Sequence, residues 1–300
     1  MLDSFLLYHR EVVIQDDQRR FLEDFTFIAA GDLAAGSLDP PDRSFLEDSP
    51  SMGDHIAFYG IWVRRHLRKV HTQHRTQGMG RLPRLDEKLL QVILLHKLNS
   101  LLDPQDSALQ SARSAVGTMI QRDLTLLLCE IRLEQWGRIF NLSRLRGMSA
   151  RDWEIHIAGA SAAAHTLMTL ASRKGSRIYL PTAHEDVYQG IDLFWLEADT
   201  MYGISVKCVV GLKDPVRVWQ VRTLPHNGND DRVTADQRTI FQGVQRFASS
   251  EGRYCIPVLV YVAKPEGGPI RLNQNWNLQT WPDQILSSGT VQESTLNLAQ

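Results

Sequence analysis

The chain contains 300 residues, of which 43% are hydrophobic and 22% are charged, and this composition is typical of a globular protein with one large domain or two of ordinary size. The 33 Lys and Arg residues and 34 Asp and Glu residues give a formal net charge of -1, which excludes a uniformly basic protein that coats a polyanion. Three widely separated cysteines, Cys129, Cys208 and Cys255, have neither a CxxC nor a Cys/His spacing, which excludes disulfide-stapled folds and zinc ribbons.

The N-terminal residues lack the basic and apolar regions of a secretory signal, and no run of about eighteen apolar residues occurs. Each cysteine lies in an apolar run, which is typical of a buried thiol. We therefore expect a cytoplasmic protein with reduced cysteines and no membrane partner.

Residues 1–148 are predicted to form an all-helical domain, because apolar residues recur at helical spacing and no strand-like alternation interrupts them. Segment 86–103 is apolar on nearly all sides, which predicts a central buried helix. Segment 31–50 is rich in Gly, Pro, Asp and Ser, and is expected to form a loop. The remaining predicted helices cover residues 11–30, 55–74 and 106–145.

Residues 149–265 are predicted to form a second domain of mixed α/β class. A helix rich in alanine is expected to run to about residue 173, and Thr234 with Gln237 fits the pattern of a capping box, which predicts a second helix. Short β-branched and aromatic runs predict strands over 177–180, 191–196, 202–210 and 255–263, with a further strand over 216–221. The predicted order is α-β-β-β-α-β. Residues 266–300 form a polar C-terminal extension that the sequence does not place.

Charge is unevenly distributed in the first 85 residues. Residues 1–60 contain twelve acids and four arginines, a net charge of -8, whereas residues 61–85 contain seven basic residues and no acid, a net charge of +7. Helical spacing would stack the basic side chains into one stripe, and a stripe of this kind neutralises phosphates. The alternatives are a solvated helix face, a face paired with the acidic segment, or a stripe that the acidic segment masks until substrate arrives. The candidate nucleic-acid-binding residues are Arg64, Arg65, Arg68, Lys69 and Arg75, and the apolar residues expected to face the core are Phe58, Ile61, Trp62, Leu67 and Val70.

Two charged residues lie inside strands that should be largely buried. Lys207 is flanked by Val206 and Cys208, and Asp192 lies between Ile191 and Leu193. An antiparallel hairpin of the two strands can bring both side chains to one face. A carboxylate can hold a divalent cation, and a lysine can stabilise negative charge on a phosphate. The alternative is a structural ion pair at the end of a sheet.

The segment that contains Asp192 and Lys207 resembles the PD-(D/E)XK nuclease superfamily, which has the restriction-endonuclease-like fold. The matching residues are Glu185-Asp186-x-x-x-Gly190-Ile191-Asp192-Leu193 and Ile204-Ser205-Val206-Lys207. The resemblance covers about residues 150–265 and implies a restriction-endonuclease-like αβββαβ core after the helical domain. It departs from the family pattern at Ser205, where the family usually has Glu or Gln.

The resemblance implies that Asp192 binds Mg²⁺ or Mn²⁺ and that Lys207 is the catalytic lysine. Glu154 on the preceding helix would be a further metal ligand, and the main-chain carbonyl of Val206 would complete the metal shell. Glu185 or Asp186 could supply the carboxylate that Ser205 lacks. Alternatively, Glu154 is only an acid favoured by a helix N-terminus, and Glu185 and Asp186 are loop acids. Gln242 on the second helix is a candidate to contact nucleic acid or the lysine, with a solvated side chain as its alternative.

The leading hypothesis is therefore a magnesium-dependent nuclease that hydrolyses phosphodiester bonds, with DNA as the expected substrate and defence, restriction or a mobile element as a fitting role. The second hypothesis is a catalytically inactive nuclease-like domain that binds nucleic acid or protein, and the third is a helical adaptor with an unrelated α/β domain. Nucleic acid is the expected partner. A protein partner of the helical domain and a homodimer are left open.

Overall fold

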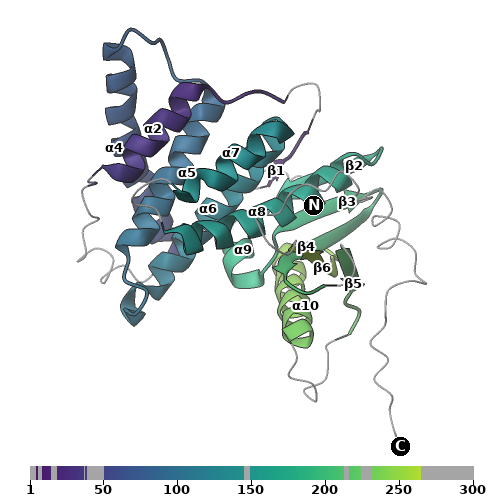
Figure 1. Cartoon of the computed structure of the whole chain (residues 1–300). Coiled ribbons are helices and arrows are strands. Elements are labelled where there is room, and N and C mark those ends of the chain that lie inside the picture. Colours follow the sequence, from purple (N-terminus) through teal and green to yellow (C-terminus); the bar gives the residue numbers. More distant parts are fainter. Residues whose placement is uncertain are drawn as a thin grey trace, which may run out of the picture. The chain divides into compact units, whose positions relative to one another are not determined.

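The structure is a computed structural model of the chain, and the chain divides into two compact units, which we describe separately (Figure 1). The helical unit is Ile14–Ala164, and the α/β unit combines Met1–Val13 with His165–Gln300. The residues that the structure describes are 5, 9–14, 19–36, 38, 51–144, 149–212, 216–223 and 232–264. The predicted extension over 266–300 and most of the predicted loop over 31–50 lie outside these residues.

The helical unit is built around one apolar helix, α5 (Arg84–Leu101). Leu89, Val92 and Ile93 have no exposed surface, and the helix packs against α2, α4 and α6. The predicted central buried helix is confirmed. The described helices of this unit are α2 (Asp24–Ala35), α4 (Met52–Thr76), α5, α6 (Gln110–Glu130), α7 (Trp136–Phe140) and the first part of α8 (Ala150–Ala171), with short 3-10 turns at Ser107–Leu109, Leu133–Gln135 and Asn141–Arg144. Among the described helices, none is both long and apolar enough to cross a bilayer.

The boundary between the units differs from the one predicted at residue 149, because it falls inside α8, between Ala164 and His165. The first part of α8 lies close to α6: a Cβ at Gly159 would come within 2.1 Å of the Gln121 side chain, and the Cys129 thiol lies 4.0 Å from the Ala164 carbonyl oxygen. Small side chains thus bring this part of the helix against another helix of its own unit.

The α/β unit contains one open, mixed six-stranded sheet in the order β1-β2-β3-β4-β6-β5. All neighbouring strands are antiparallel except β4 and β6, which are parallel. The strands are β1 (Arg10–Glu11), β2 (Ser176–Leu180), β3 (Leu193–Glu197), β4 (Thr200–Val209), β5 (Val216–Gln220) and β6 (Ile256–Ala263). The mixed α/β class and the predicted strands are confirmed, whereas the pairing of β1 with β2 gives the first residues of the chain a place in the sheet that the sequence did not predict.

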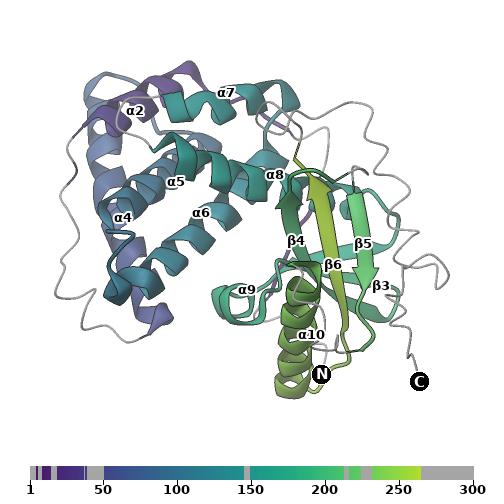
Figure 2. The same ribbon diagram turned by 60° about the horizontal axis from the view of Figure 1, so that its bottom comes forward.

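Helix α10 (Arg232–Glu251) covers one face of this sheet, and the short helix α9 (Ala183–Gln189) connects β2 to β3 (Figure 2). Period-2 alternation along β4 sends Gly203, Ser205 and Lys207 to one face. That face meets α10, because a Cβ at Gly203 would come within 2.7 Å of the Val244 side chain. Phe194, Leu259 and Phe247 are fully buried in the core between the sheet and α10.

The closest approach of α10 to its neighbours is at Gly243. A Cβ at this position would lie 1.8 Å from the carbonyl oxygen of Gln189 at the end of α9, so any larger residue must push two backbone segments apart. Helices α9 and α10 pack against each other at this point. The α9–α10 contact therefore depends on a glycine in the interior of a helix.

We expect the substitution Gly243→Ala to lower the free energy of unfolding by about 1–3 kcal/mol, because the added methyl group overpacks the contact with the Gln189 backbone. Chemical denaturation measures the change. The control is Gly60→Ala in α4, where no atom lies within 4 Å of the added Cβ, and where alanine should stabilise the helix by up to about 1 kcal/mol. Equal destabilisation by the two substitutions would contradict the close contact.

Candidate active site

Asp192 lies immediately before β3, and its carboxylate is held by β4. The Asp192 amide donates to the Ile204 carbonyl at 2.8 Å, which fixes the backbone next to β4. One carboxylate oxygen, Oδ2, accepts from the Val206 amide at 2.7 Å and from the Ser205 hydroxyl at 3.2 Å. The other oxygen, Oδ1, has no hydrogen-bond partner among the described residues. The carboxylate is therefore oriented by the backbone while one of its oxygens stays available.

Lys207 lies two residues beyond Ser205 on the same face of β4, as the alternation predicts. Its register neighbours are Tyr261 of β6 and, one strand further, Arg217 of β5. Lys207 is partly buried, and it forms no ion pair with Asp192 or any other acid among the residues that the structure describes. The structure thus places Asp192 and Lys207 on one face, without the direct ion pair between them that was the alternative.

The structure places Tyr261 of β6 and Asp236 of α10 beside this face, and neither residue was predicted. The hydroxyl of Tyr261 donates to Oδ2 of Asp236 on α10 at 2.6 Å, and the guanidinium of Arg232 lies 3.9 Å from the same oxygen. Tyr261 is the β6 residue in register with Lys207. The register of parallel strands β4 and β6 is the signal that would have found Tyr261, but it cannot be read from single strands in the sequence.

The donor set around Asp192 fits a magnesium ion only in part. Mg²⁺ keeps several waters and is commonly held by one or two carboxylates together with substrate phosphates, so the available oxygen of Asp192 is a suitable ligand. No group of three His, Cys, Asp or Glu side chains that could hold a metal occurs in the described part of the chain. Ser205, in place of the usual carboxylate, donates a hydrogen bond to Asp192. The chain thus offers Asp192 as one anchoring ligand, and substrate and water would have to complete the shell.

Glu185, a predicted metal ligand, is bonded elsewhere. Both of its carboxylate oxygens lie within 2.9 Å of Nε2 of His9, and Oε2 also accepts from the Thr182 amide at 2.6 Å in a capping box of α9. The His9 and Glu185 side chains are 2% and 9% exposed. The expectation that Glu185 supplies the missing carboxylate is therefore not supported, because its oxygens are used by His9 and the helix cap.

The hydrogen bonds of His9 determine its protonation. Its Nδ1 lies 2.9 Å from the Phe5 carbonyl, which can only accept, so Nδ1 carries a proton. Its Nε2 faces a carboxylate, so an imidazolium satisfies both contacts. Burial alone would lower the His9 pKa, but the bonds to Glu185 and Phe5 raise it above 6.5. Burial would likewise raise the Glu185 pKa, yet His9 and Thr182 lower it below 4.5.

The other predicted site residues lie on α8, α9, α10 and β4. Glu154 is exposed on the part of α8 that belongs to the helical unit, so its metal-binding role stays a prediction. Asp186 is partly buried in the first turn of α9, and Gln242 is partly buried on α10. The Val206 amide donates to Asp192, and the metal-binding role of the Val206 carbonyl stays a prediction.

The basic stripe lies on α4 as the spacing predicts. Arg64, Arg65, Arg68, Lys69 and Arg75 are all exposed. The four arginines of this set form no ion pair with any acid among the described residues. On the opposite side, Trp62, Leu67 and Val70 are buried, as expected for the core face. The expectation for Ile61 was wrong: it is 60% exposed, because the basic side of α4 includes it.

Comparisons of the chain with protein-family models, with curated proteins and with solved structures found no match.

We expect the His9–Glu185 pair to make stability depend on pH. The raised His9 pKa contributes stability that is present below about pH 6.5 and is lost as the pH rises through the folded pKa; the lowered Glu185 pKa contributes stability above about pH 4.5 that is lost as the pH falls through its folded value. The stabilising effect should therefore be largest between these limits.

Denaturation of wild type and His9→Gln across this pH range measures the effect. The substitution should cost about 3 kcal/mol within the window, because it leaves a buried carboxylate without its cation, and less above it. The control His71→Gln removes a more exposed pair, with 3.6 Å between His71 and Glu87, and should cost less than about 1 kcal/mol. A cost of His9→Gln that does not vary with pH would contradict the charged pair.

Proposed function

We propose that the α/β unit is a magnesium-dependent nuclease domain that hydrolyses phosphodiester bonds of DNA at a site formed by Asp192 and Lys207. The observation that carries the proposal is the position of Asp192 immediately before β3 and of Lys207 on the neighbouring strand β4. A lysine without an acidic partner among the described residues there shares one sheet face with an oriented carboxylate. Apart from the additional elements α9 and β5, the order α8, β2, β3, β4, α10 and β6 is the order that the resemblance to PD-(D/E)XK nucleases implies.

Each side chain has a definite task in this proposal. The Val206 amide and the Ser205 hydroxyl fix the Asp192 carboxylate through Oδ2, which leaves Oδ1 to face a cation. When bound, Mg²⁺ supplies charge neutralisation at the phosphate and a water of lowered pKa. Lys207 places a positive charge beside the phosphate oxygens and orients the attacking water. Tyr261 and Asp236 form a hydrogen-bonded pair between β6 and α10 that supports this face.

The basic residues of α4 supply a second element of the proposal. Four exposed arginines free of ion pairs with described acids can each neutralise a phosphate, and such contacts give affinity that does not depend on sequence. The helical unit would then hold the nucleic acid while the α/β unit cleaves it.

A second function is favoured by one observation, the presence of Ser205 where a metal-binding carboxylate is usual. With only Asp192 as an anchoring ligand, the domain would bind nucleic acid without cutting it. Lys207 and the basic residues of α4 would serve this function equally well. The two functions differ in whether the protein forms a cleavage product: the nuclease needs Asp192 and a divalent cation to form it, and the binding domain forms none.

We expect the full-length protein to cleave plasmid or single-stranded DNA with Mg²⁺ or Mn²⁺, and we expect Asp192→Asn and Lys207→Met each to lower the rate at least about a hundredfold, because charge stabilisation at the reacting phosphate is lost. The side-chain carbonyl that Asp192→Asn introduces can still accept from the Val206 amide, so the fold is retained. Product formation on gels and thermal midpoints are measured together.

The matched control is Lys174→Ala, an exposed lysine of the same unit, which should cleave like wild type. Equal cleavage by wild type and Lys207→Met would place the active site elsewhere. Binding of DNA without cleavage in any divalent cation, including Mn²⁺, would favour the non-catalytic alternative.

For the basic residues of α4, we expect Arg65→Ala and Arg68→Ala each to reduce the slope of log affinity against log salt by about 0.9 on duplex DNA, because each removes one phosphate contact. Fluorescence anisotropy over a salt series measures the slope. The control Arg151→Ala removes an exposed arginine of α8 in the same unit and should leave the slope unchanged. Identical slopes for all three variants and wild type would rule out α4 as the binding surface.

A further inference from the structure

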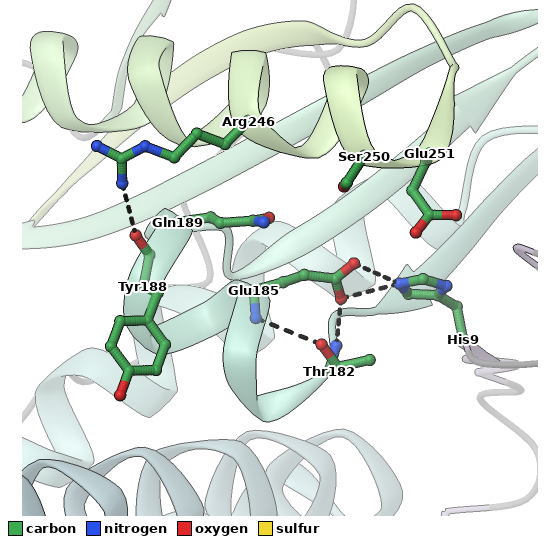
Figure 3. Close-up of a pocket in the computed structure, with 8 residues that line it drawn as sticks. All are labelled: His9, Thr182, Glu185, Tyr188, Gln189, Arg246, Ser250 and Glu251. Atoms are coloured by element: carbon green, nitrogen blue, oxygen red, sulfur yellow. Dashed lines mark hydrogen bonds and ion pairs between the residues drawn. The ribbon is translucent and has the colours of Figure 1, made fainter. Parts of the chain in front are cut away.

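A pocket of about 560 Å³ lies between α9 and the C-terminal half of α10, and His9 of the N-terminal segment forms part of its wall (Figure 3). This volume falls within the range of about 300–1,000 Å³ that is usual for small-molecule sites. Neither Asp192 nor Lys207 lines the pocket, whose α10 residues are Arg246, Ser250 and Glu251.

One buried polar group of the pocket lacks a partner. The Gln189 side chain is 6% exposed, and its Oε1 atom is enclosed without a hydrogen bond among the described residues. Figure 3 shows the amide extending between α9 and α10 toward Ser250. A buried carbonyl oxygen without a hydrogen bond is costly, and a ligand that donates to it would remove that cost.

The His9–Glu185 pair forms the end of the pocket near Glu251, and it does not act as a catalytic base there. Both ring nitrogens of His9 are occupied, one by Phe5 and the other by Glu185, so His9 cannot take a proton from the Ser250 hydroxyl. Ser250 itself donates to the Phe247 carbonyl at 3.0 Å. The pocket is therefore a candidate site for binding a ligand and not for catalysis, and its polar groups other than His9 and Glu185 would recognise the ligand.

The remaining charges lie at opposite ends of the pocket. Arg246 is at one end, where its guanidinium lies 3.4 Å from the Tyr188 carbonyl, and Glu251 is at the other (Figure 3). Glu251 forms no ion pair with a basic side chain among the described residues. The Tyr188 ring is half exposed and points away from Arg246 (Figure 3). A complementary ligand carries a negative group at one end, hydrogen-bond donors at the other, and a planar polar edge between them.

We propose that this pocket binds a nucleotide with an adenine base, and this inference rests on the proposed nuclease function for its substrate class. A glutamine amide matches the N6 and N7 edge of adenine, with Oε1 accepting from the N6 amine and Nε2 donating to N7. Arg246 contacts the phosphate, and Glu251 accepts from the base amine. Only Gly190 and Ile191 separate Gln189 from Asp192, so a base held here belongs to a nucleotide near the cleavage site.

Calorimetric titration of full-length Asp192→Asn with dAMP, dGMP, dCMP and dTMP tests the proposal in a protein that does not cleave its ligand. We expect dAMP to bind most tightly, and Gln189→Leu to weaken it about tenfold or more. Arg246→Gln, which changes an exposed side chain, should weaken the binding of dAMP but not the binding of deoxyadenosine. The matched control Gln245→Leu changes an exposed glutamine of α10 outside the pocket and should bind like the parent protein. Comparison of dAMP with the trinucleotide dT-dA-dT distinguishes a free nucleotide from a base within a strand.

Equal affinity for dAMP in Gln189→Leu and Gln245→Leu would overturn the proposal, as would binding of triglycine with no response to any nucleotide, which would indicate a peptide ligand. The thermal midpoint of each variant shows whether it is folded. If Gln189→Leu is unfolded, the comparison of dAMP with deoxyadenosine in Arg246→Gln tests the proposal. Binding of dAMP by a protein that cleaves no DNA would support the pocket while contradicting the nuclease function. Cleavage of DNA by a protein that binds no nucleotide in this pocket would support the nuclease function and contradict the pocket proposal.

Discussion

The contact of α10 with the sheet is the constraint on which the rest of the α/β unit depends. Two glycines, Gly203 on β4 and Gly243 on α10, bring the helix against the strands and against the end of α9. The apolar core residues of α10, Ile240, Val244 and Phe247, lie in its middle and C-terminal parts. Asp236 near the start of α10 meets Tyr261 beside Lys207, and Arg246 and Glu251 near its end line the pocket.

The first residues of the chain complete this unit through contacts distant in sequence. Phe5 is 1% exposed and stacks on the His9 ring at a centroid distance of 3.9 Å, while its edge contacts include Phe194. His9 then forms the buried pair with Glu185, 176 residues further along the chain. Apolar packing of Phe5 and the ion pair of His9 thus fix the same segment, and together they orient the start of α9, which ends at Gln189.

Much of the fold was predictable because it leaves a local pattern. Helix α5 is apolar on nearly all sides, and the alternation of β4 places Ser205 and Lys207 on one face, with Asp192 immediately before the adjoining strand β3. The contacts that were missed are long-range pairings. Neither the bond between Tyr261 and Asp236 nor the partner of Glu185 has a sequence spacing that could reveal it, because each depends on which strands and helices meet after folding. The division of the chain inside α8 was missed for the same reason, since the small residues of that helix fit a sheet or another helix equally well.

The shortness of β1 has a consequence for self-association. An outer strand with many unpaired amide and carbonyl groups invites another chain to add a strand, and proteins often avoid this with very short edge strands. Beyond β2, the sheet ends on only two residues, Arg10 and Glu11, and both are exposed and charged. Glu11 is also engaged by Arg177 of β2, at 2.9 Å. This edge gives a second copy of the chain little backbone to pair with, so growth of the sheet across two molecules is disfavoured at β1.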